Sequence, residues 1–450
     1  MGELEVPADA LYGASTQRAV ENFAISGQSM HPTLIHAYGL IKEAAASANQ
    51  RIGVLDSALA SAIVAAAREV AEGKHDAHFP VNVYQTGSGT STNMNANEVI
   101  ATLCRQRGVD VHPNDHVNLG QSSNDTFPTA IHIATCLQIR DALMPALELL
   151  EKSLSAKASE FHNVLKIGRT HLMDAVPMRL GQEFSGYAKQ AERGVDRCHK
   201  AIKALLEIPL GGTAIGTGLN CHPDFPEAAI ALLSERTGFR FHRAENAFEA
   251  QAARDALVEA HGQINTIATS LFKIANDIRL LASGPRCAIG EINLPAIQPG
   301  SSIMPGKVNP VLCEALTMVS ARVFGNQSTV TFCGANGHLE LNTFMPLMGQ
   351  AMLESIQLLA NGSKTFAEKC VSGISANRER CAELIEMSFS MVTSLVPLIG
   401  YDQAAAIAKE AKASGETIRS LCMEKRTTLG ITAEQLSAAL DPISMSDTQV

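Results

Sequence analysis

The chain has 450 residues, a net charge of -9 at pH 7 and a hydrophobic fraction of 46%. The acidic balance argues against a nucleic-acid-binding surface. Only 4% of the residues are aromatic and none is tryptophan, which favours close-packed helices over aromatic-rich β structure. The N-terminus has no signal-peptide pattern, and no uncharged apolar run reaches membrane-spanning length. We therefore expect a soluble, cytoplasmic protein.

Three domains are expected along the chain: a mixed, mainly helical one at 1–120, a long-helix domain at 121–378 and a small helical one at 379–450. In the first, alanine-rich helices are predicted between Pro32 and Gly53 and between Leu55 and Gly73. Glycine- and asparagine-rich loops follow these helices. Four residues interrupt the short elements of the last domain: Gly400, Gly415, Gly430 and Pro442.

The clearest predicted helix runs from about Glu245 to Ser283. Its apolar residues recur at alternating three- and four-residue steps, the period of a helix. These residues are Ile264, Ile267, Leu271, Ile274, Ile278 and Leu281. Flanking alanines widen the apolar arc, so we expect neighbouring helices on several sides, some of them from other subunits. Helices are also predicted at 128–160, 178–207, 309–333 and 341–370, and strand signals are sparse.

The ten cysteines are scattered, with no C-x-x-C pair and no Cys/His cluster. This pattern is typical of free thiols in a reducing compartment and predicts no metal site. We expect the thiols to be buried as small apolar side chains.

The segment from Gly300 to Pro310 is the most informative part of the sequence. Two glycines bracket a serine pair, and Lys307 follows the second glycine. Asn309 and Pro310 suit the N-cap and the first position of a following helix. We interpret the segment as a hinged loop at a helix N-terminus, which favours a bound anion. The alternative is a plain connection, because Gly/Ser/Pro loops with one lysine are common and usually only connect elements. A nucleotide-binding P-loop is excluded, because the glycine spacing of G-x-x-x-x-G-K-S/T is not met.

Five other short polar segments interrupt the helical pattern. Residues 87–95 are dense in hydroxyls, amides and glycine, and residues 121–125 precede a proline and a helix. Both are also typical of turns and N-caps. Residues 168–171 contain His171, a candidate acid or base, although a lone histidine is more often structural. Residues 211–218 do not meet G-x-G-x-x-G and are interpreted as a tight, pocket-lining loop. Arg286 either clamps a carboxylate or satisfies helix carbonyls.

These segments share neutral hydrogen-bond donors and a few cations, without metal ligands or nucleotide motifs. Such a set suits a small polycarboxylate substrate. It favours proton transfer over cofactor chemistry.

Gly300–Pro310 resembles the signature loop of the fumarase/aspartase superfamily, and the other segments match its remaining blocks in order. The resemblance covers essentially the whole chain and is closest to the iron-independent class II fumarases. His171 stands where aspartases typically have glutamine, and Ser122-Ser123 stands where they have Ser-Thr. Residues 305–307 and 336–342 also follow the fumarase pattern. Departures are the aspartase-like residues 292–295 with Gln298, and His116 at a position where the family has aspartate.

The resemblance implies an all-α fold with a central five-helix bundle. Four copies would form a homotetramer with a twenty-helix core, and each site would lie where three subunits meet. The implied activity is the reversible hydration of fumarate to (S)-malate in the tricarboxylic acid cycle, with no cofactor and no metal.

The family also implies roles for individual residues. Ser301 would remove the C3 proton, and Lys307 with Asn309 would stabilise the resulting aci-carboxylate. His171, paired with Glu314, would handle the water at C2. The implied substrate-binding residues are Ser88, Gly89, Thr90, Ser122, Ser123, Asn124, Thr170, Ser302, Lys307, Val308 and Asn309. A second dicarboxylate site corresponds to His112, Pro113, Asn114 and Asp115.

Rival interpretations remain at this point. Aspartate ammonia-lyase activity shares the carbanion chemistry and differs in the leaving group. Argininosuccinate and adenylosuccinate lyases need different flanking segments for their larger substrates. A non-catalytic scaffold protein should have lost Ser301, Lys307 or His171, and all three are present.

Overall fold

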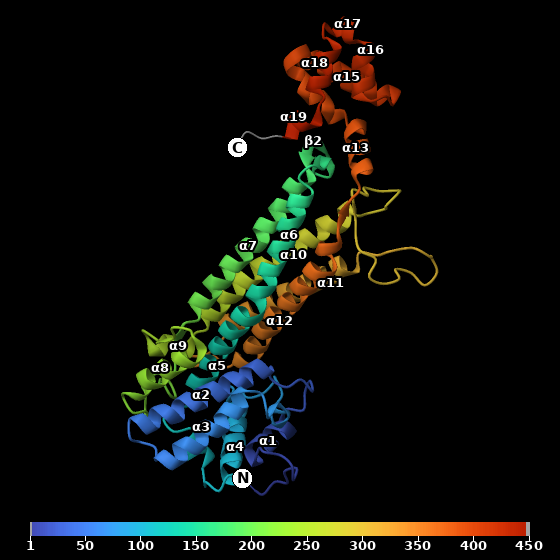
Figure 1. The fold of residues 1–450 in the computed structure, drawn as a ribbon. Helices are drawn as coiled ribbons and strands as arrows, with labels where there is room; N and C mark the ends of the chain where they lie inside the picture. Colours follow the sequence, from blue (N-terminus) through green and yellow to red (C-terminus); the bar gives the residue numbers. More distant parts are fainter. Residues whose placement is uncertain (1, 447–450) are drawn as a thin grey trace. The chain divides into compact units, whose positions relative to one another are not determined.

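The computed structural model describes residues 2–446, which are mostly helical (Figure 1). Within this range the strands form three two-stranded sheets. The predicted all-α class is therefore confirmed. Contacts between residues divide the chain into two compact units. The predicted domain boundaries at residues 120 and 378 stay a prediction.

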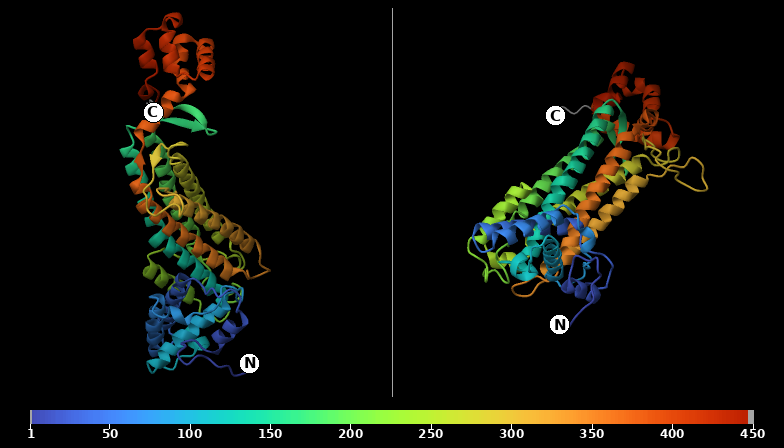
Figure 2. Two further views of the ribbon diagram at one scale, coloured as in Figure 1. Left: turned by 90° about the vertical axis from the view of Figure 1, so that its right-hand side faces the viewer. Right: turned by 60° about the horizontal axis from the view of Figure 1, so that its bottom comes forward.

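The first unit comprises Met1–Ala146, Gly194–Thr269 and Val319–Asn361. Its complete helices are α1 (Ala14–Asn22), α2 (Pro32–Arg51), α3 (Ser57–Ala71), α4 (Thr90–Gln106), α5 (Ser123–Gln138), α8 (Phe225–Thr237) and α9 (Ala247–Ala252). It also holds the single turns η1 (Asp76–His78), η2 (Pro113–Val117) and η3 (Ile139–Leu143), and the short parallel pair β3 (Glu207–Ile208) and β4 (His242–Arg243). Helix α2 packs against α3, α5 and α8, and Figures 1 and 2 show α2 and α3 side by side in blue.

The second unit comprises Leu147–Arg193, Ser270–Met318 and Gly362–Val450. Its strands are β1 (Leu165–Thr170), β2 (Met173–Arg179), β5 (Ile292–Asn293) and β6 (Ser375–Ala376). Its helical elements are η4 (Val371–Gly373), α13 (Arg378–Met387), η5 (Phe389–Leu395), α14 (Val396–Ile399), α15 (Tyr401–Ser414), α16 (Ile418–Glu424), α17 (Arg426–Leu429), α18 (Ala433–Ala439) and α19 (Pro442–Ser446).

Five long helices contribute residues to both units. They are α6 (Met144–Glu160), α7 (Leu180–Ala204), α10 (Asp255–Leu281), α11 (Val311–Ala335) and α12 (Met345–Lys369). The predicted helices at 128–160, 178–207, 309–333 and 341–370 are confirmed by α5 to α7, α11 and α12. The six periodic apolar residues of α10 are all at most 5% exposed, as the helical period predicted.

The predicted helix from Glu245 to Ser283 is wrong at its start, because α9 and α10 are separate. Ala253 is extended between them, at φ -97° and ψ 163°. The buried Arg254 guanidinium donates to Ala250 O at 2.6 Å and to Gln251 O at 2.7 Å, so it satisfies the last carbonyls of α9. Its own carbonyl accepts from the first turn of α10. The spacing of apolar residues does not reveal a helix break of this kind, because the break is stabilised by a capping side chain.

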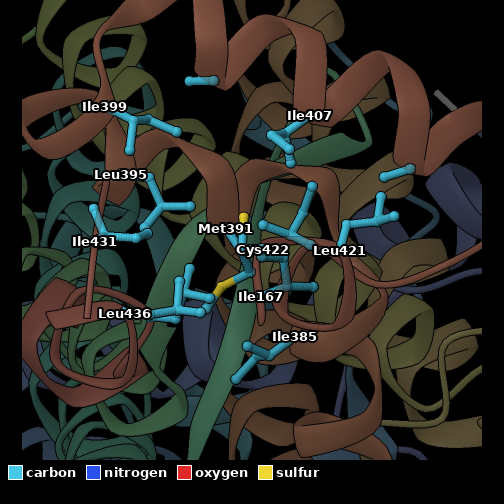
Figure 3. Close-up of a cluster of buried hydrophobic side chains, with 14 residues drawn as sticks. Ile167, Ile385, Met391, Leu395, Ile399, Ile407, Leu421, Cys422, Ile431 and Leu436 are labelled. Carbon is cyan, nitrogen blue, oxygen red and sulfur yellow. The ribbon is translucent and has the colours of Figure 1, made fainter. Parts of the chain in front are cut away.

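A hairpin that the sequence did not predict joins β1 to β2. Its pairing places Pro177 opposite Ile167, and Pro is unusual within a strand. The two-residue turn is His171-Leu172 instead of the Asn-Gly pair that signals such hairpins. Ile167 reaches the buried apolar cluster of the C-terminal helices, between Ile385 and Cys422 (Figure 3). The C-terminal core therefore anchors the hairpin within the second unit.

The ten cysteines are free thiols, and eight of them are buried, as predicted. Among residues 2–446 no single helix is long and apolar enough to cross a membrane. One bent pair, Arg378–Met387 with Phe389–Ile399, meets the length and composition criteria.

Candidate active site

A chain of hydroxyl groups connects the N-termini of α4 and α5 in the first unit. Ser88 Oγ lies 2.9 Å from Thr90 Oγ1, which lies 2.7 Å from Ser123 Oγ. Thr90 opens α4 and Ser123 opens α5. Since the first N–H groups of a helix lack intrahelical partners, two such ends side by side favour an anion. We call Ser88, Thr90 and Ser123 the hydroxyl cluster.

Gly89 is required where these segments meet. Its φ of 75° lies in the left-handed region, which favours glycine. A Cβ there would lie 1.9 Å from the Phe127 ring. The glycine therefore lets α4 begin directly against α5.

Asp125 holds the polar segment at residues 121–125 in place at the start of α5. With Ser122 it forms a capping box at the start of α5, so the N-cap interpretation is confirmed. The buried carboxylate also accepts from Gly211 N at 3.0 Å and Thr213 N at 2.9 Å. Burial raises the pKa of Asp125 to about 6, against the lowering effect of these N–H groups.

Asn124 is tied to the same glycine-rich loop. Its Nδ2 donates to Ala214 O at 2.8 Å. The loop at 211–218, interpreted from sequence as pocket-lining, therefore lies against the start of α5. Ser122 caps the helix, and the hydroxyls of the half-buried Thr90 and the buried Ser123 meet beside it.

The Gly300–Pro310 loop of the second unit is closed at its base. Gly300 N donates to Lys307 O at 2.9 Å, and Asn309 Nδ2 donates to Gly300 O at 2.6 Å. A Cβ at Gly300 would lie 2.3 Å from Lys307 O, so the closure needs glycine. Residues 302–308 are exposed.

Ser301 receives two backbone hydrogen bonds. Its Oγ accepts from Ile303 N at 3.2 Å and from Met304 N at 3.1 Å. Hydrogen bonds donated to an oxygen favour its anionic form.

The predicted N-cap is displaced by one residue. Helix α11 begins at Val311, and Pro310 O accepts from Glu314 N at 3.1 Å. Pro310 therefore occupies the cap position. Asn309 is not the cap because its amide closes the loop base instead.

His171 lies at the tip of the β1–β2 hairpin. His171 and Leu172 have φ values of 58° and 60°, as a two-residue turn of this hand requires. Histidine adopts this conformation more often than most residues do, but leucine rarely does, so the strain lies mainly at Leu172 and such strain often marks a functional position. His171 and Thr170 are exposed, and Leu172 is 73% exposed.

Glu291 supports the base of this hairpin and was not singled out by the sequence. It is fully buried, with Lys166 Nζ at 3.0 Å from Oε2 and Arg169 Nη2 at 2.9 Å from Oε1. Lys166 also pairs with Glu183 at 2.7 Å. Glu291 lies more than a hundred residues along the chain from both cations, so no local pattern predicts the contact.

The segment of the expected second dicarboxylate site forms the turn η2. His112 Nδ1 lies 3.1 Å from Asp115 N, and His112 N donates to His116 Nδ1 at 3.0 Å. Asn114 and Asp115 are exposed beside them. His116, the departure noted in the sequence, therefore helps to close this turn.

The expected site residues are divided between the two units. Ser88, Thr90, Ser123 and Asn124 lie in the first unit, and the hairpin and the loop lie in the second. The pairing expected between His171 and Glu314 is not formed. Both side chains are exposed and lack an ion pair or hydrogen bond with any described residue. Likewise, residues 2–446 hold no group of three His, Cys, Asp or Glu side chains arranged for a metal.

Comparisons with known proteins cover the whole chain. The family described as Lyase matches residues 2–325, and the family described as Fumarase C C-terminus matches residues 391–447. A fumarate hydratase class II from Corynebacterium glutamicum is 54% identical over 100% of this chain and 96% of its own length. The Mycobacterium tuberculosis H37Rv relative of the same name is 53% identical over 99% of this chain and 94% of its length.

Solved structures show the same fold. The class II fumarase from Schistosoma mansoni superposes with a TM-score of 0.96 at 40% identity, covering 100% of this chain and 98% of that one. A fumarate lyase:delta crystallin from Brucella melitensis superposes with a TM-score of 0.91 at 44% identity, over 98% of both chains.

Proposed function

Because the chain belongs to the class II fumarate hydratase family, we propose that it catalyses the reversible hydration of fumarate to (S)-malate in the tricarboxylic acid cycle. The observation that carries this proposal is 54% identity to a fumarate hydratase class II over 100% of the chain. We further propose that the reaction uses no cofactor and takes place in the cytoplasm.

At C3 of malate, Ser301 is the proposed base. The two N–H groups directed at its oxygen support the anionic form that a serine needs to remove a weakly acidic proton. Removal of that proton places a second negative charge on the adjacent carboxylate. Lys307, the Asn309 segment and the N-terminus of α11 are cationic or N–H-rich, and we assign them to stabilise this charge.

At C2, the hydroxyl of malate must leave as water. We assign His171 to protonate it, or to activate water in the reverse direction, with Glu314 as its partner in the assembled protein. Thr170 and the hydroxyl cluster, together with Gly89, Ser122, Asn124, Ser302 and Val308, would hold the carboxylates and the water. His112–Asp115 is the proposed second dicarboxylate site.

We propose a homotetramer in which three subunits build each site. Exposure of the proposed catalytic groups supports this, because His171, Lys307 and Glu314 have no described ion-pair partner in their own chain. The apolar side chains beside them are also exposed, with Leu172 at 73% and Met318 at 67%. We also propose that the chain has three domains, with boundaries at residues 120 and 378.

The assay follows fumarate absorbance with L-malate or L-aspartate as substrate. The proposal expects rapid fumarate formation from malate and none from aspartate. Ser301→Ala should abolish turnover and leave the thermal midpoint unchanged, because this half-exposed hydroxyl contacts only its own loop. Fumarate formation from aspartate alone would replace the hydratase with an ammonia-lyase, and near-normal turnover by Ser301→Ala would remove Ser301 as the base.

Shared sites are tested by complementation. Ser301→Ala and Asn124→Ala are each expected to be inactive as homotetramers. If the two residues meet from different subunits, a co-expressed one-to-one mixture regains about a quarter of the sites. No recovered activity in mixed tetramers would contradict the shared-site arrangement.

A further inference from the structure

Lys42 of α2 is a fully buried cation. It contacts both of the segments that carry the hydroxyl cluster, one at the start of α4 and one before α5. Its ammonium donates to Asn93 Oδ1 at 2.9 Å, to Asn118 Oδ1 at 3.0 Å and to Gln121 Oε1 at 3.0 Å. An ammonium has three N–H donors, so each donor has one amide oxygen. No described carboxylate forms an ion pair with it.

Burying an unpaired charge is costly, so this arrangement needs a reason. Burial lowers the pKa of Lys42 to about 7, opposed by the field of Asp125. Two titratable groups face the ammonium: Asp125 from α5 and Tyr38 from α2, whose ring centroid is 6.0 Å away. Methionine would fill the same space at lower cost, yet the chain has lysine here.

The three amides belong to the segments that carry the hydroxyl cluster. Asn93 lies one turn after Thr90 on α4. Asn118 and Gln121 form the turn that leads directly into Ser122 and Ser123. Lys42 therefore has one contact with the start of α4 and two with the start of α5.

The amides are also joined to one another. Asn118 Oδ1 accepts from Asn93 Nδ2 at 3.1 Å, and Asn118 Nδ2 donates to Gln121 O at 3.0 Å. Without the ammonium, Asn118 Oδ1 would keep its bonds from Asn93 and Asn97 Nδ2. Gln121 Oε1 would lose its described donor, and Asn93 Oδ1 would keep only the 3.5 Å contact from Thr126 Oγ1. Because oxygens with no donor between them repel, the two helix starts would move apart or their amides would turn over.

We propose that Lys42 is a positioning residue: its ammonium sets the spacing of the α4 and α5 N-termini, and through it the 2.7 Å contact between Thr90 and Ser123 that receives a substrate carboxylate. This inference rests on the proposed function. Lys42 does not touch the substrate, so its loss should weaken substrate binding more than it slows the chemical step.

The first test is Lys42→Met, measured as kcat and KM with malate. We expect KM to rise by about tenfold or more and kcat to change by less than about threefold, the split typical of lost positioning in binding. The matched control is Lys157→Met. Lys157 is also buried, at 8% exposed against 0% for Lys42, pairs with Glu160 and Ile374 O at 2.7 Å each, and contacts none of the hydroxyl cluster. It should leave kcat and KM unchanged.

The second test asks whether Lys42 acts through Ser123. In a double mutant, Ser123→Ala should add little to the KM of Lys42→Met, because both changes remove the same contact. Lys42→Gln, which keeps two donors, should give an intermediate KM. If Lys42→Met does not fold, Lys42→Gln carries the comparison, together with the wild-type pH profile of KM. We expect the KM of the wild-type protein for malate to rise as Lys42 loses its proton near pH 7.

Three results would overturn the inference. The first is a KM equal to that of the wild type in a folded Lys42→Met variant, and the second is full additivity of the KM effects of Lys42→Met and Ser123→Ala. The third is a KM equal to that of the wild type in Lys42→Gln, together with no rise in the wild-type KM across the pH profile. A wild-type protein inactive on malate would instead overturn the proposed function. The two failures are therefore distinguished by the wild-type assay alone.

Discussion

Removing the charge of Glu291 gives a sharp test of how the His171 hairpin is held. Glu291→Gln preserves the side-chain shape but leaves Arg169 with no carboxylate and Lys166 with Glu183 alone. Breaking a buried ion pair costs about 3–5 kcal/mol. Since Lys166 keeps one partner, we expect the lower end of this range, about 3 kcal/mol.

Hydrogen exchange of the β1 and β2 amides measures this loss locally. Because a tenfold change corresponds to about 1.4 kcal/mol, protection should fall about a hundredfold if the hairpin opens independently. Turnover should fall as well, because His171 is carried by the same hairpin.

Glu192→Gln is the matched control, the same substitution in an ion pair that is exposed. Lys189 and Glu192 are 57% and 54% exposed, and such pairs contribute less than about 1 kcal/mol. Equal hairpin protection in the two variants would refute the assignment of Glu291 as the buried support of the hairpin.

Three further predictions concern the rest of the chain. Gly89→Ala should greatly reduce both stability and malate turnover because its Cβ meets the Phe127 ring, whereas Gly430→Ala, with φ 69° and open space around it, should cost only about 1 kcal/mol in unfolding measurements. Burial lowers the pKa of His132 from 6.5 to about 4, so its contribution to stability is present above pH 6.5 and is lost as pH falls through 4. His132→Gln should therefore flatten acid unfolding curves by up to about 3 kcal/mol between these pH values. A thiol reagent should label the exposed Cys287 before the eight buried cysteines, as mass spectrometry would show, and equal rates would contradict the burial pattern.

Local patterns predicted much of the fold. The periodic apolar residues of α10 are buried, and Ser122 caps α5 as its sequence context indicated. Both signals depend on residues within a few positions of one another. The start of α10 and the cap of α11 were mispredicted because distant or backward-reaching side chains, Arg254 and Asn309, satisfy the backbone there.

The sequence by itself determined the helical class, the glycine-hinged loop around Ser301 and the family to which these segments belong. Each follows from residue spacing along a short stretch of chain. Only the tertiary structure decided that His171 occupies a strained hairpin tip, that Glu291 neutralises the cations beneath it, and that Lys42 joins the starts of α4 and α5. The last two features depend on burying charged groups against partners far away in sequence, and no local spacing encodes which partners meet. The turn at His171-Leu172 escaped prediction because it lacks the Asn-Gly pair that signals such hairpins.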